Sequence, residues 1–594
     1  MPAIHLLPEI IANQIAAGEV VQRPASVVKE LLENAVDAGS QRITLIFKDA
    51  GRSLIQVIDD GHGMDEVDAR MCFERHATSK IVEAQDLFNL HTLGFRGEAM
   101  ASIAAVAQVV LTTRHMEEEL GTRLCINGGE VAGQEAVATD SGSNIEVKNL
   151  FFNLPARRSF LKSNNVESKH IIDEFQRVAL SQPSIAFALY HNDSKLYDLP
   201  ATKLNHRIVH LFGKGHQSQL IACKVQTPQM TIDGYIGDPK RAKRTRGEQF
   251  FFVNGRYVRS AYLHHAVKKA LQEVLPADAF PFYVLFITLP ADNVDVNVHP
   301  TKTEVKFEDE SILYATLTTT VKKTIAAHHI TPSIDFQTNT NDISMPTAYA
   351  YAAPKKAKEH ATSAERSYAS FAAHSQKEPE ITSDGGIKLI SLINQPTQKL
   401  QTAQAAKLVK MQLHCHYIIV QVKSGMLLID QHAAHHRILF EEVKERQKKG
   451  SNATQQLLFP ITVILSQSDA LLLKQCEPAI AQLGFRFSLD ETDKLLITGV
   501  PAGRPLQDTQ VLFESILEQY KTYQTEGAEI EMEERWARAW AKRAALKHGT
   551  PLTPGEIDSL VDQLFACSNS KLAPDNIPIW RVVPHQTLGD LLHE

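Results

Sequence analysis

The sequence has few cysteines, and their spacing matches neither a disulfide framework nor a zinc ribbon. Its six cysteines are spread over 594 residues without any Cys-x-x-Cys pair. Scattered cysteines of this kind are typical of proteins from a reducing compartment. No run of about 18 apolar residues occurs, so no membrane span is expected. Residues 1–10 also lack the basic and apolar segments of a signal peptide. We therefore expect a soluble, cytoplasmic protein.

The sequence also lacks an overall excess of positive charge. It contains 62 Lys and Arg residues against 68 Asp and Glu residues, which gives a formal net charge of -6. A surface that binds nucleic acid must therefore be local. Seven basic residues and one acid lie between Lys240 and Arg259, and a second basic cluster lies near residue 158. Solvated loops are the alternative, but we expect both clusters to bind the phosphate backbone of a nucleic acid without reading its bases, through Arg157, Arg158, Lys162, Arg241, Lys243, Arg244, Arg246 and Arg256.

Length and composition indicate several domains with ordinary hydrophobic cores. At roughly 100–200 residues per domain, a chain of 594 residues contains three or more. Hydrophobic residues make up 43% and charged residues 22%, as in typical globular proteins. Residues 331–386 differ, because they are rich in Ala, Ser, Thr and Pro and hold few large aliphatic side chains. We expect this stretch to be a flexible tether.

The stretch from Ser26 to Asp37 combines an apolar stripe with a concentrated polar face. Its apolar residues recur at helical spacing: Val27, Val28, Leu31, Leu32, Ala35 and Val36. The opposite face carries three acids and an amide: Glu30, Glu33, Asn34 and Asp37. Such a face is self-repelling unless a cation or a ligand lies among its members. The stretch therefore predicts either a ligand-binding helix or a solvated polar face.

Two expected strands lead from this helix to a glycine-rich turn. Residues 41–48 alternate as a strand does, and residues 54–58 form a second apolar run. The second run ends at Asp59-Asp60-Gly61-His62-Gly63. An acid at a strand end, followed by glycines that permit close approach of the backbone, indicates the edge of a ligand site.

Three further motifs follow along the chain. His76-Ala77-Thr78-Ser79-Lys80 precedes Gly94-Phe95-Arg96-Gly97-Glu98-Ala99, which opens an Ala-rich helical stretch, and Gly142-Ser143 opens a strand. Glycines before a helix N-terminus offer free N–H groups to a phosphate. This glycine loop is neither a P-loop nor a dinucleotide fingerprint, and in isolation a plain turn would explain it equally well.

The order of these motifs resembles that of a known superfamily. Glu30 with Asn34, the Asp59–Gly63 turn, the Gly94–Gly97 loop and Gly142-Ser143 resemble the four nucleotide-binding motifs of the GHKL ATPases. Five sequence segments resemble more specifically the MutL family of DNA mismatch repair proteins: NQIAAGEV, KELLENAVDAGS, HATSK, GFRGEA and NLPARR. This resemblance is strong to about residue 310 and looser beyond it.

The resemblance implies a multidomain fold of the α/β and α+β classes. Residues 1–215 would form a GHKL ATPase sandwich, and residues 216–331 a transducer domain like ribosomal protein S5. Residues 332–386 would be a disordered linker. Residues 387–594 would form an α+β domain that dimerises the chain.

The resemblance also implies a site for ATP and Mg²⁺. Glu30 is the expected general base, and Asn34 the expected Mg²⁺ ligand. Asp59, Gly61 and Gly63 would face the adenine. Further ATP contacts are expected from Thr78, Ser79, Gly94, Arg96, Gly97, Ser143 and Lys302, the last a catalytic lysine that would cross from the second domain to the γ-phosphate. The sequence has Asp60 where the family usually has Asn, and we expect this extra carboxylate near the base edge to leave function intact.

The expected activity is slow, Mg²⁺-dependent ATP hydrolysis by a homodimer in DNA mismatch repair. The dimer would bind double- and single-stranded DNA at the nucleoid and couple recognition by MutS to a downstream nuclease and helicase. Residues 455–460, QQLLFP, also match the QxxLxP pattern of peptides that bind the sliding clamp. The clamp contacts would come from Gln455, Leu458 and Pro460, unless the apolar residues of this stretch are buried core.

Many MutL proteins nick DNA at a C-terminal metal site of pattern DQHAxxExxxxE, which this sequence keeps only in part. Asp430-Gln431-His432-Ala433 and Glu441 are present, but His436, Lys542 and the Ala573–Asp575 segment replace family ligands. A binuclear centre needs carboxylate, imidazole and thiolate ligands together. We therefore do not expect endonuclease activity, and a degenerate but working nuclease site is the alternative.

Three other interpretations remain. The His-Cys-His segment at residues 414–416 would allow a remodelled metal site with the nearby histidines, although surface histidines are the simpler explanation. A gyrase-type subunit would need a metal-binding acidic cluster where the tether lies. A binding scaffold with an inactive ATP site is disfavoured by the retained motifs.

Overall fold

The computed structural model describes most of the chain on either side of one long segment. The described residues are 17–18, 20–80, 92–94, 97–276, 279–290, 294–295, 305–328, 409–449, 453–490, 494–502, 509–525 and 530–590. The linker predicted over residues 332–386 lies outside the described residues, as do Arg96 and Lys302.

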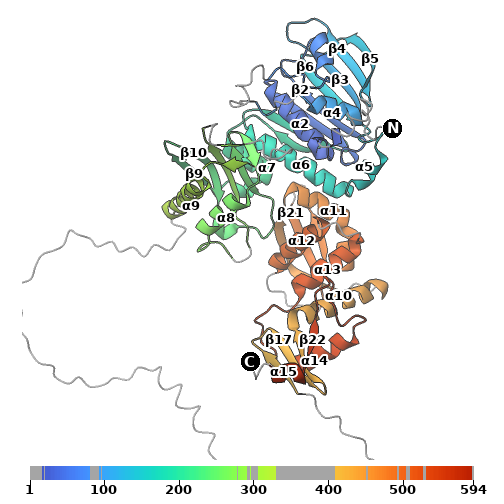
Figure 1. Ribbon diagram of the computed structural model, residues 1–594, viewed down its shortest axis with the longest axis vertical. Coiled ribbons are helices and arrows are strands. Elements are labelled where there is room, and N and C mark those ends of the chain that lie inside the picture. The colour runs from blue at the N-terminus through green and yellow to red at the C-terminus, as the bar shows by residue number, and fades with distance from the viewer. Residues whose placement is uncertain are drawn as a thin grey trace, which may run out of the picture. The chain divides into compact units, whose positions relative to one another are not determined.

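The first domain is built on one eight-stranded sheet, with α2, α4 and α6 packed against it (Figure 1). The strand order is β5-β4-β3-β6-β2-β1-β7-β8, and only the β1–β7 pair is parallel. The strands are β1 (Arg42–Lys48), β2 (Leu54–Asp59), β3 (Gln108–Arg114), β4 (Gly121–Asn127), β5 (Glu130–Val137), β6 (Gly142–Lys148), β7 (Ala186–His191) and β8 (Ser194–Leu199). The helices are α2 (Pro24–Asp37), α3 (Glu66–Met71), α4 (Ala99–Val106), α5 (Pro155–Phe160), α6 (Asn164–Ser181) and α7 (Leu204–Phe212).

Helix α2 buries its apolar stripe and keeps its polar row on the other side. Pro24 lies in its first turn, where the missing N–H costs no hydrogen bond. Four apolar side chains of the helix are at most 1% exposed: Val27, Val28, Leu31 and Leu32. The four residues of the polar row are half-buried: Glu30, Glu33, Asn34 and Asp37. The structure thus confirms the predicted helix, which begins two residues earlier than expected.

The second domain is a five-stranded sheet of order β12-β11-β13-β10-β9, covered by two helices. Its strands are β9 (Leu220–Gln226), β10 (Thr231–Gly237), β11 (Gln249–Val253), β12 (Arg256–Val258) and β13 (Tyr283–Thr288), followed by the short pair β14 (Val294–Asp295) and β15 (Lys306–Phe307). Its helices are α8 (Ala261–Ala270) and α9 (Glu310–Ala327). Phe250, Phe252 and Val284 of this sheet belong to the same hydrophobic cluster as the core of the first domain. Shared burial therefore holds the two domains together.

Residues 409–590 contain two smaller sheets, each with its own hydrophobic core. The four-stranded sheet has β16 (Lys410–Leu413), β17 (Tyr417–Val422), β18 (Gly425–Asp430) and β22 (Trp580–Pro584), with α10 (Gln431–Lys449), α14 (Pro554–Ala566) and α15 (His585–Asp590). The three-stranded sheet has β19 (Thr454–Ile464), β20 (Arg486–Leu489) and β21 (Lys494–Pro501), with α11 (Gln467–Gln482), α12 (Thr509–Thr525) and α13 (Met532–Ala544).

The apolar patterns of the sequence predict a strand over residues 413–422 and helices over residues 262–275 and 536–548, and the structure corrects all three. Residues 413–422 are not one strand, because His414 and Cys415 have φ values of 49° and 54° and turn the chain between β16 and β17. The helix predicted over 536–548 begins at Met532 and ends at Ala544, since the next residue is extended. The helix predicted over 262–275 ends at Ala270, shortly before Pro276.

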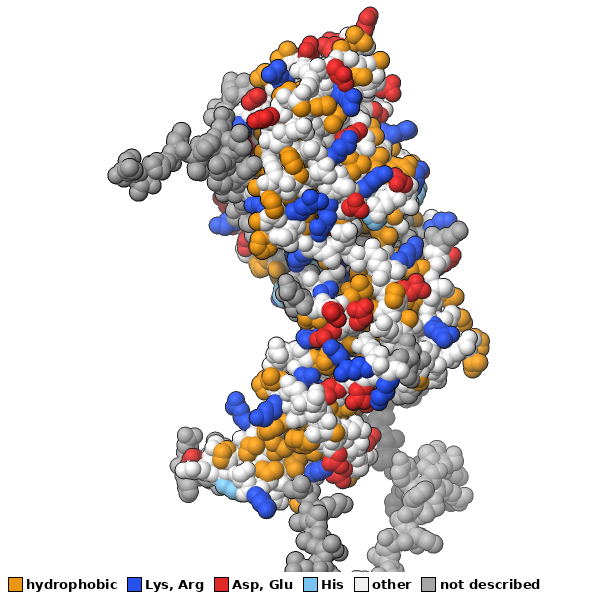
Figure 2. Space-filling model, turned by 90° about the vertical axis from the view of Figure 1, so that its right-hand side faces the viewer, with side chains coloured by type: hydrophobic (Ala, Val, Ile, Leu, Met, Phe, Trp, Pro, Cys, Tyr) orange, Lys and Arg blue, Asp and Glu red, His pale blue; other side chains and the backbone are white. Residues whose placement is uncertain are grey.

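The C-terminal domain exposes apolar side chains on one of its sheets. Figure 2 shows hydrophobic side chains gathered on one face of this domain, at the level of β17 and β22. Met411, Leu413 and Tyr417 of β16 and β17 are each at least 39% exposed, while Ile418 and Val420 on the other side of β17 are buried. Both sides of this sheet are therefore apolar. Among the described helices, none is long and apolar enough to cross a membrane.

Candidate functional site

The polar row of α2 holds a lysine from the loop after α3. Lys80 Nζ donates to Asn34 Oδ1 at 3.0 Å and to Asp37 Oδ2 at 2.5 Å. The side chains of Lys80 and Asp37 are only 20% and 7% exposed, so their ion pair is shielded from solvent. An ammonium group thus compensates part of the negative charge that the sequence places on this helix face.

The glycine loop begins against the same carboxylate. Leu93 N and Gly94 N donate to the two oxygens of Asp37 at 2.9 Å and 3.0 Å. A Cβ atom on Gly94 would lie 3.0 Å from Lys80 Nζ and 3.7 Å from Asn34 Oδ1. Glycine therefore permits the close approach of this loop to α2, and the structure brings together Asn34 and Gly94, two of the predicted site residues.

Asp59 lies beyond the C-terminal end of α2, at the end of β2. The residue is 8% exposed, and its Oδ1 accepts hydrogen bonds from Ser40 Oγ at 3.2 Å and from Gly61 N at 2.9 Å. Burial raises the pKa of Asp59, although the bonds from Gly61 and Ser40 oppose the shift. A Cβ atom on Gly61 would lie 2.7 Å from Ala38 O. Asp59 and Gly61 thus form a closely packed edge with a hydrogen-bond acceptor.

Asp60 serves the backbone at the start of β1. Its Oδ1 accepts the N–H groups of Gln41 and Arg42, both at 2.7 Å. The side-chain oxygen of an asparagine is able to accept the same two hydrogen bonds. This role accounts for the compatibility of Asp with a position where the family usually has Asn.

A pair of hydroxyl groups joins β3 and β6 near the glycine turn. Thr113 is fully buried, and its Oγ1 donates to Gly142 O at 2.9 Å and lies 3.0 Å from Ser143 Oγ. The N–H of Met64 donates to Thr113 Oγ1 at 3.0 Å, directly after Gly63, whose φ is 68°. Ser143, a predicted ATP contact, therefore lies beside this turn. Sequence reasoning missed Thr113, because a threonine in a strand carries no special signal.

The remaining predicted ATP contacts lie around α2 or outside the described residues. Glu30 is half-buried on α2, one turn before Asn34. Thr78 Oγ1 accepts the N–H of Lys80 at 3.2 Å, and Ser79 lies between them in the chain. Gly97 has a φ of 60° and packs against the backbone of residue 77. Outside the described residues lie Arg96 and Lys302.

The oxygen atoms of α2 suit a hard cation. Asn34 and Asp37 offer the amide and carboxylate oxygens that Mg²⁺ prefers. A positive group already lies among them, since the Lys80 ammonium is within 3.0 Å of both side chains. These residues therefore fit the Mg²⁺ that the family implies, and Asp37 joins Asn34 as a candidate ligand that sequence reasoning did not single out.

The predicted DNA contacts differ in the exposure of their side chains, and among the exposed ones the Arg246 guanidinium lies 4.8 Å from the centre of the Phe280 ring. Exposed are Arg158, Arg241 and Arg246, and half-buried are Arg157, Lys162 and Arg244. Lys243 pairs with Glu248 at 2.7 Å. Arg256 donates to Thr92 O at 2.7 Å, within the first domain. The structure therefore does not place Arg256 with the exposed members of its cluster.

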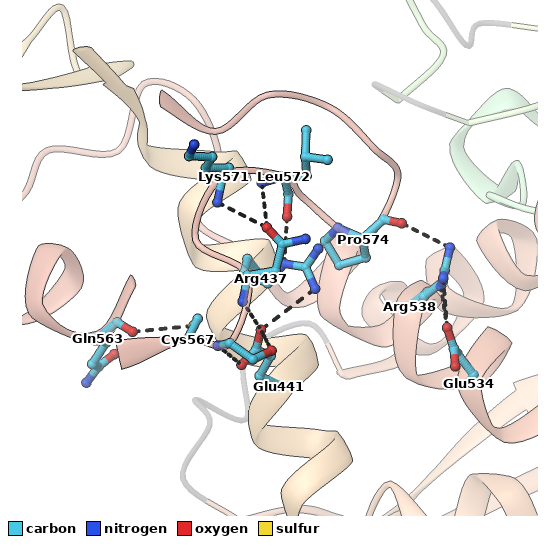
Figure 3. Close-up of polar contacts among 11 residues, drawn as sticks. Arg437, Glu441, Glu534, Arg538, Gln563, Cys567, Lys571, Leu572 and Pro574 are labelled. Atoms are coloured by element: carbon cyan, nitrogen blue, oxygen red, sulfur yellow. Dashed lines mark hydrogen bonds and ion pairs between the residues drawn. The ribbon is translucent and has the colours of Figure 1, made fainter. Parts of the chain in front are cut away.

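In the C-terminal domain, Glu441 caps a loop before β22. Its carboxylate accepts hydrogen bonds from Ser568 N at 2.7 Å, Ser568 Oγ at 2.9 Å and Asn569 N at 3.3 Å. Arg437 lies 3.8 Å from the same carboxylate and donates to Leu572 O at 2.7 Å (Figure 3). Through these contacts, the Glu441 carboxylate stabilises the loop.

Lys542 and Asp575 form an ion pair at positions where family ligands are replaced. Lys542 Nζ lies 2.6 Å from Asp575 Oδ2, and Tyr523 OH donates to Asp575 Oδ1 at 2.7 Å. Burial alone would raise the pKa of Asp575, but the contacts with Lys542 and Tyr523 lower it. Arg538 holds the same loop by donating to Pro574 O at 2.9 Å (Figure 3). Both oxygens of Asp575 are thus engaged by side chains of the chain.

The histidines of this domain contact both the backbone and one another, and the ring centroid of His432 lies 5.4 Å from that of His548 and 6.4 Å from that of His436. His432 Nδ1 lies 2.8 Å from Leu546 O, and His435 Nδ1 accepts the N–H of Leu546 at 2.9 Å. His436 is 3% exposed, and burial lowers its pKa to about 4. In the described part of the chain, no group of three or more His, Cys, Asp and Glu side chains is arranged to hold a metal ion. Together with Lys542, these residues do not match the donor set that a binuclear nuclease centre needs.

The segment with the clamp-binding pattern lies on β19 and bulges from its sheet. The pairing of β19 with β21 shifts register between residues 456 and 461. Leu458 and Phe459, inside this bulge, are 94% and 85% exposed. Leu457 packs against a hydrophobic core. Of the three apolar residues in this segment, only Leu457 therefore contributes to a core, and Leu458 and Phe459 face solvent.

Three family models match the chain. The model described as histidine kinase-, DNA gyrase B-, and HSP90-like ATPase matches residues 22–151, which include α2, the Asp59 turn, the glycine loop and Ser143. A model for the C-terminal domain of DNA mismatch repair protein matches residues 208–326, and the MutL C terminal dimerisation domain matches residues 410–552. The N-terminal domain, with this fold and site, is an ATPase domain of the GHKL class.

Similar proteins cover nearly the whole chain. The DNA mismatch repair protein MutL of Flavobacterium psychrophilum is 42% identical over 96% of this chain and 96% of its own, and that of Parabacteroides distasonis is 42% identical over 98% of each. The solved ATPase domain of Aquifex aeolicus MutL complexed with ADP is 26% identical, has a TM-score of 0.34 and covers 46% of this chain and 93% of its own. On the identity of its relatives, this chain belongs to the MutL family of DNA mismatch repair proteins, with an ATPase domain and a C-terminal dimerisation domain.

Substitution of the two neighbouring acids should separate their roles. Asp59→Asn puts an amide donor at the buried acceptor edge, so we expect the Kd for ATP to rise about tenfold or more, which is about 1.4 kcal/mol. Asp60→Asn keeps an acceptor for the N–H groups of Gln41 and Arg42, so its Kd should stay within about twofold of wild type. Titration with a fluorescent ATP analogue measures both values. Equal losses in the two variants would contradict this division of roles.

Proposed function

We propose that this chain binds ATP beside α2 and hydrolyses it slowly, so that the ATP cycle times the closing of a homodimer on DNA. The observation that carries this proposal is the convergence on α2, where Lys80 and two N–H groups of the glycine loop meet the oxygens of Asn34 and Asp37. Oxygen ligands, a cation and loop N–H groups around one helix face are the elements that a triphosphate site requires.

Glu30 is the proposed general base of the hydrolysis. It is half-buried on the face of α2 that carries Asn34, one helical turn away, so both side chains reach the same side of the helix. Asn34, with Asp37, would hold Mg²⁺, which offsets the negative charge of the triphosphate when bound. Lys80 adds a positive charge next to these oxygens.

At the other end of the site, Asp59 would accept the adenine amino proton. Its fixed contacts with Ser40 and Gly61 support this role, because a preorganised acceptor loses little entropy on binding. Gly61 and Gly63 would let the backbone approach the ring. Ser143, whose hydroxyl lies beside Thr113, adds a polar group at the same turn.

A lid over the phosphates is proposed from Thr78, Ser79, Gly94, Arg96 and Gly97. Its described base is held by Asp37. Lys302 would reach the γ-phosphate from the second domain and so link the nucleotide state to domain position. The resemblance to the family supports the roles of Arg96 and Lys302, which lie outside the described residues.

The proposed setting is mismatch repair of chromosomal DNA in the cytoplasm, where the homodimer couples MutS to a downstream nuclease and helicase. The match to the dimerisation domain supports a homodimer, and so do the exposed Met411 and Leu413, because an apolar sheet face is stabilised when a second copy covers it. The exposed Arg158, Arg241 and Arg246 support binding to DNA phosphates.

Glu30→Ala should separate binding from hydrolysis. The variant keeps Asn34, Asp37 and Asp59, so its Kd for ATP should stay within about threefold of wild type, whereas kcat should fall by about 100-fold or more because the base is lost. Equilibrium titration and a steady-state phosphate-release assay measure the two quantities. A wild-type rate in Glu30→Ala would exclude Glu30 as the base, and no Mg²⁺-dependent hydrolysis by the wild type would exclude the proposed function.

We further propose that this chain does not nick DNA, since the Lys542–Asp575 ion pair lies among the replaced ligand positions. Supercoiled plasmid incubated with the protein and Mn²⁺ should remain intact under conditions in which ATP is hydrolysed. Agarose electrophoresis of the plasmid measures the nicked fraction. Protein-dependent nicking that is lost in Asp430→Ala would contradict this proposal and would exclude a contaminating nuclease as its source.

A second proposed interaction is with the sliding clamp, through the bulge of β19. Its exposed Leu458 and Phe459 favour this function, because a clamp groove binds an extended peptide through apolar anchors. The double variant Gln455→Ala, Leu458→Ala should bind the clamp about tenfold more weakly, as measured by surface plasmon resonance. Ile464→Ala, an exposed residue of the same strand beyond the pattern, is the control that should bind as wild type does. Equal binding by the double variant and the wild type would contradict the proposal.

A further inference from the structure

Arg256 reaches from the second domain to the polar row of α2. It begins β12, directly after the turn at Asn254 and Gly255, and its Nη2 donates to Thr92 O at 2.7 Å. Burial lowers the pKa of the Arg256 guanidinium, and that shift is opposed by three carboxylates of α2: Glu33, Asp37 and Glu30. A cation of the second domain therefore interacts with the acids of the first.

The hairpin that carries Arg256 is fixed on both sides. The Asn254 side chain donates to Leu289 O and accepts from Leu289 N, each at 3.0 Å. On the other side, the Tyr257 ring lies 4.2 Å from the guanidinium carbon of Arg177, which belongs to α6 of the first domain. The position of the second domain therefore determines the position of the Arg256 backbone, from which its side chain extends to the first domain.

The carbonyl that Arg256 binds belongs to the base of the glycine loop. Asp37 accepts two backbone N–H groups of this loop from the side of α2. Arg256 holds the carbonyl of Thr92, and the Thr92 hydroxyl donates to Gly94 O at 2.7 Å. The base of the loop is thus clamped between charged side chains from two domains. Because a Cβ atom on Gly94 would lie 3.7 Å from Asn34 Oδ1, a shift of this segment changes the surroundings of the proposed Mg²⁺ ligand.

We propose that Arg256 is a positioning residue for ATP hydrolysis, which fixes the base of the glycine loop against α2 and makes the alignment of the site depend on the seating of the second domain. The inference rests on the proposed ATPase function. Arg256 acts through Thr92 and Asp37, so it affects turnover more than affinity. A planar guanidinium is able to serve a carbonyl and nearby carboxylates at once, whereas a lysine ammonium matches that geometry poorly.

Position in the sequence alone would assign Arg256 to the basic cluster that is expected to bind DNA. Its contacts distinguish it from that cluster. Arg241 and Arg246 are exposed, whereas Arg256 is half-buried and hydrogen-bonded to the first domain. The two roles predict different losses, because a DNA contact affects DNA affinity and a positioning residue affects hydrolysis without DNA.

The test compares Arg256→Gln and Arg256→Lys with Lys224→Gln in the full-length protein. Lys224 is an exposed cation of β9 in the same domain and serves as the matched control. Without DNA, kcat should fall about tenfold in Arg256→Gln, about threefold in Arg256→Lys and not at all in Lys224→Gln. The Kd for ATP and the nucleotide bound per chain should stay within about twofold of wild type in all three variants.

Three results would overturn the proposal. The first is an unchanged kcat in Arg256→Gln. The second is a fall in kcat that is matched by an equal fall in nucleotide bound per chain, because that pattern reports only a loss of folded protein. The third is an intact kcat with a loss of DNA affinity equal to that of Arg158→Gln, which would assign Arg256 to DNA. A wild-type protein without ATPase activity would overturn the proposed function and this inference together, whereas the three results above leave the proposed function standing.

Discussion

The contact between the Lys80 ammonium and the oxygens of Asn34 and Asp37 is the interaction on which the N-terminal site depends. Acids one turn apart on a half-buried helix face repel each other, and a cation among them removes much of that cost. Asp37 also accepts two N–H groups of the glycine loop. One carboxylate, that of Asp37, therefore takes part both in the compensation of charge on α2 and in the placement of the glycine loop. A ligand that competes for these oxygens must also act on the loop.

The second domain acts on the same set of charges from another direction. Phe252 and Val284 of the second domain pack into the core of the first domain. With the domain in this position, Arg256 donates to Thr92 at the base of the glycine loop. Under the proposed function, a triphosphate and its metal would bring charges of both signs to the α2 acids, whose partners include one side chain from each domain. Nucleotide state and domain position would then be coupled through the same few carboxylates.

Local patterns were sufficient to predict α2, β1, β2 and β6, because hydrophobic periodicity and glycine positions are properties of short stretches. The order of the motifs predicted the ATPase fold, which the family match confirms. The partners within the site could not be predicted in this way. Lys80 and Asn34 are 46 residues apart in the sequence, and Arg256 and Thr92 are 164 apart. Such pairs arise from tertiary packing, and neither member carries a sequence signal that identifies the other. Thr113 is a similar case, since only its neighbours in the sheet give its hydroxyl a role.

The C-terminal domain also pairs a carboxylate with an ammonium group, but its lysine belongs to a packed helix and not to a loop. Lys542 lies 2.6 Å from Asp575 and belongs to α13, which Trp536 and Trp540 anchor in a core. A lysine fixed to a packed helix neutralises a carboxylate, but its ammonium has no lone pair for a metal and does not replace the thiolate or imidazole ligand of a metal centre. In the ATPase domain, by contrast, Lys80 lies in a loop, and its neighbour Asn34 is a neutral oxygen ligand that a metal is able to share. Beside α2 the ammonium therefore shares its surroundings with a neutral amide oxygen, whereas beside α13 it faces a carboxylate whose two oxygens are both engaged by side chains.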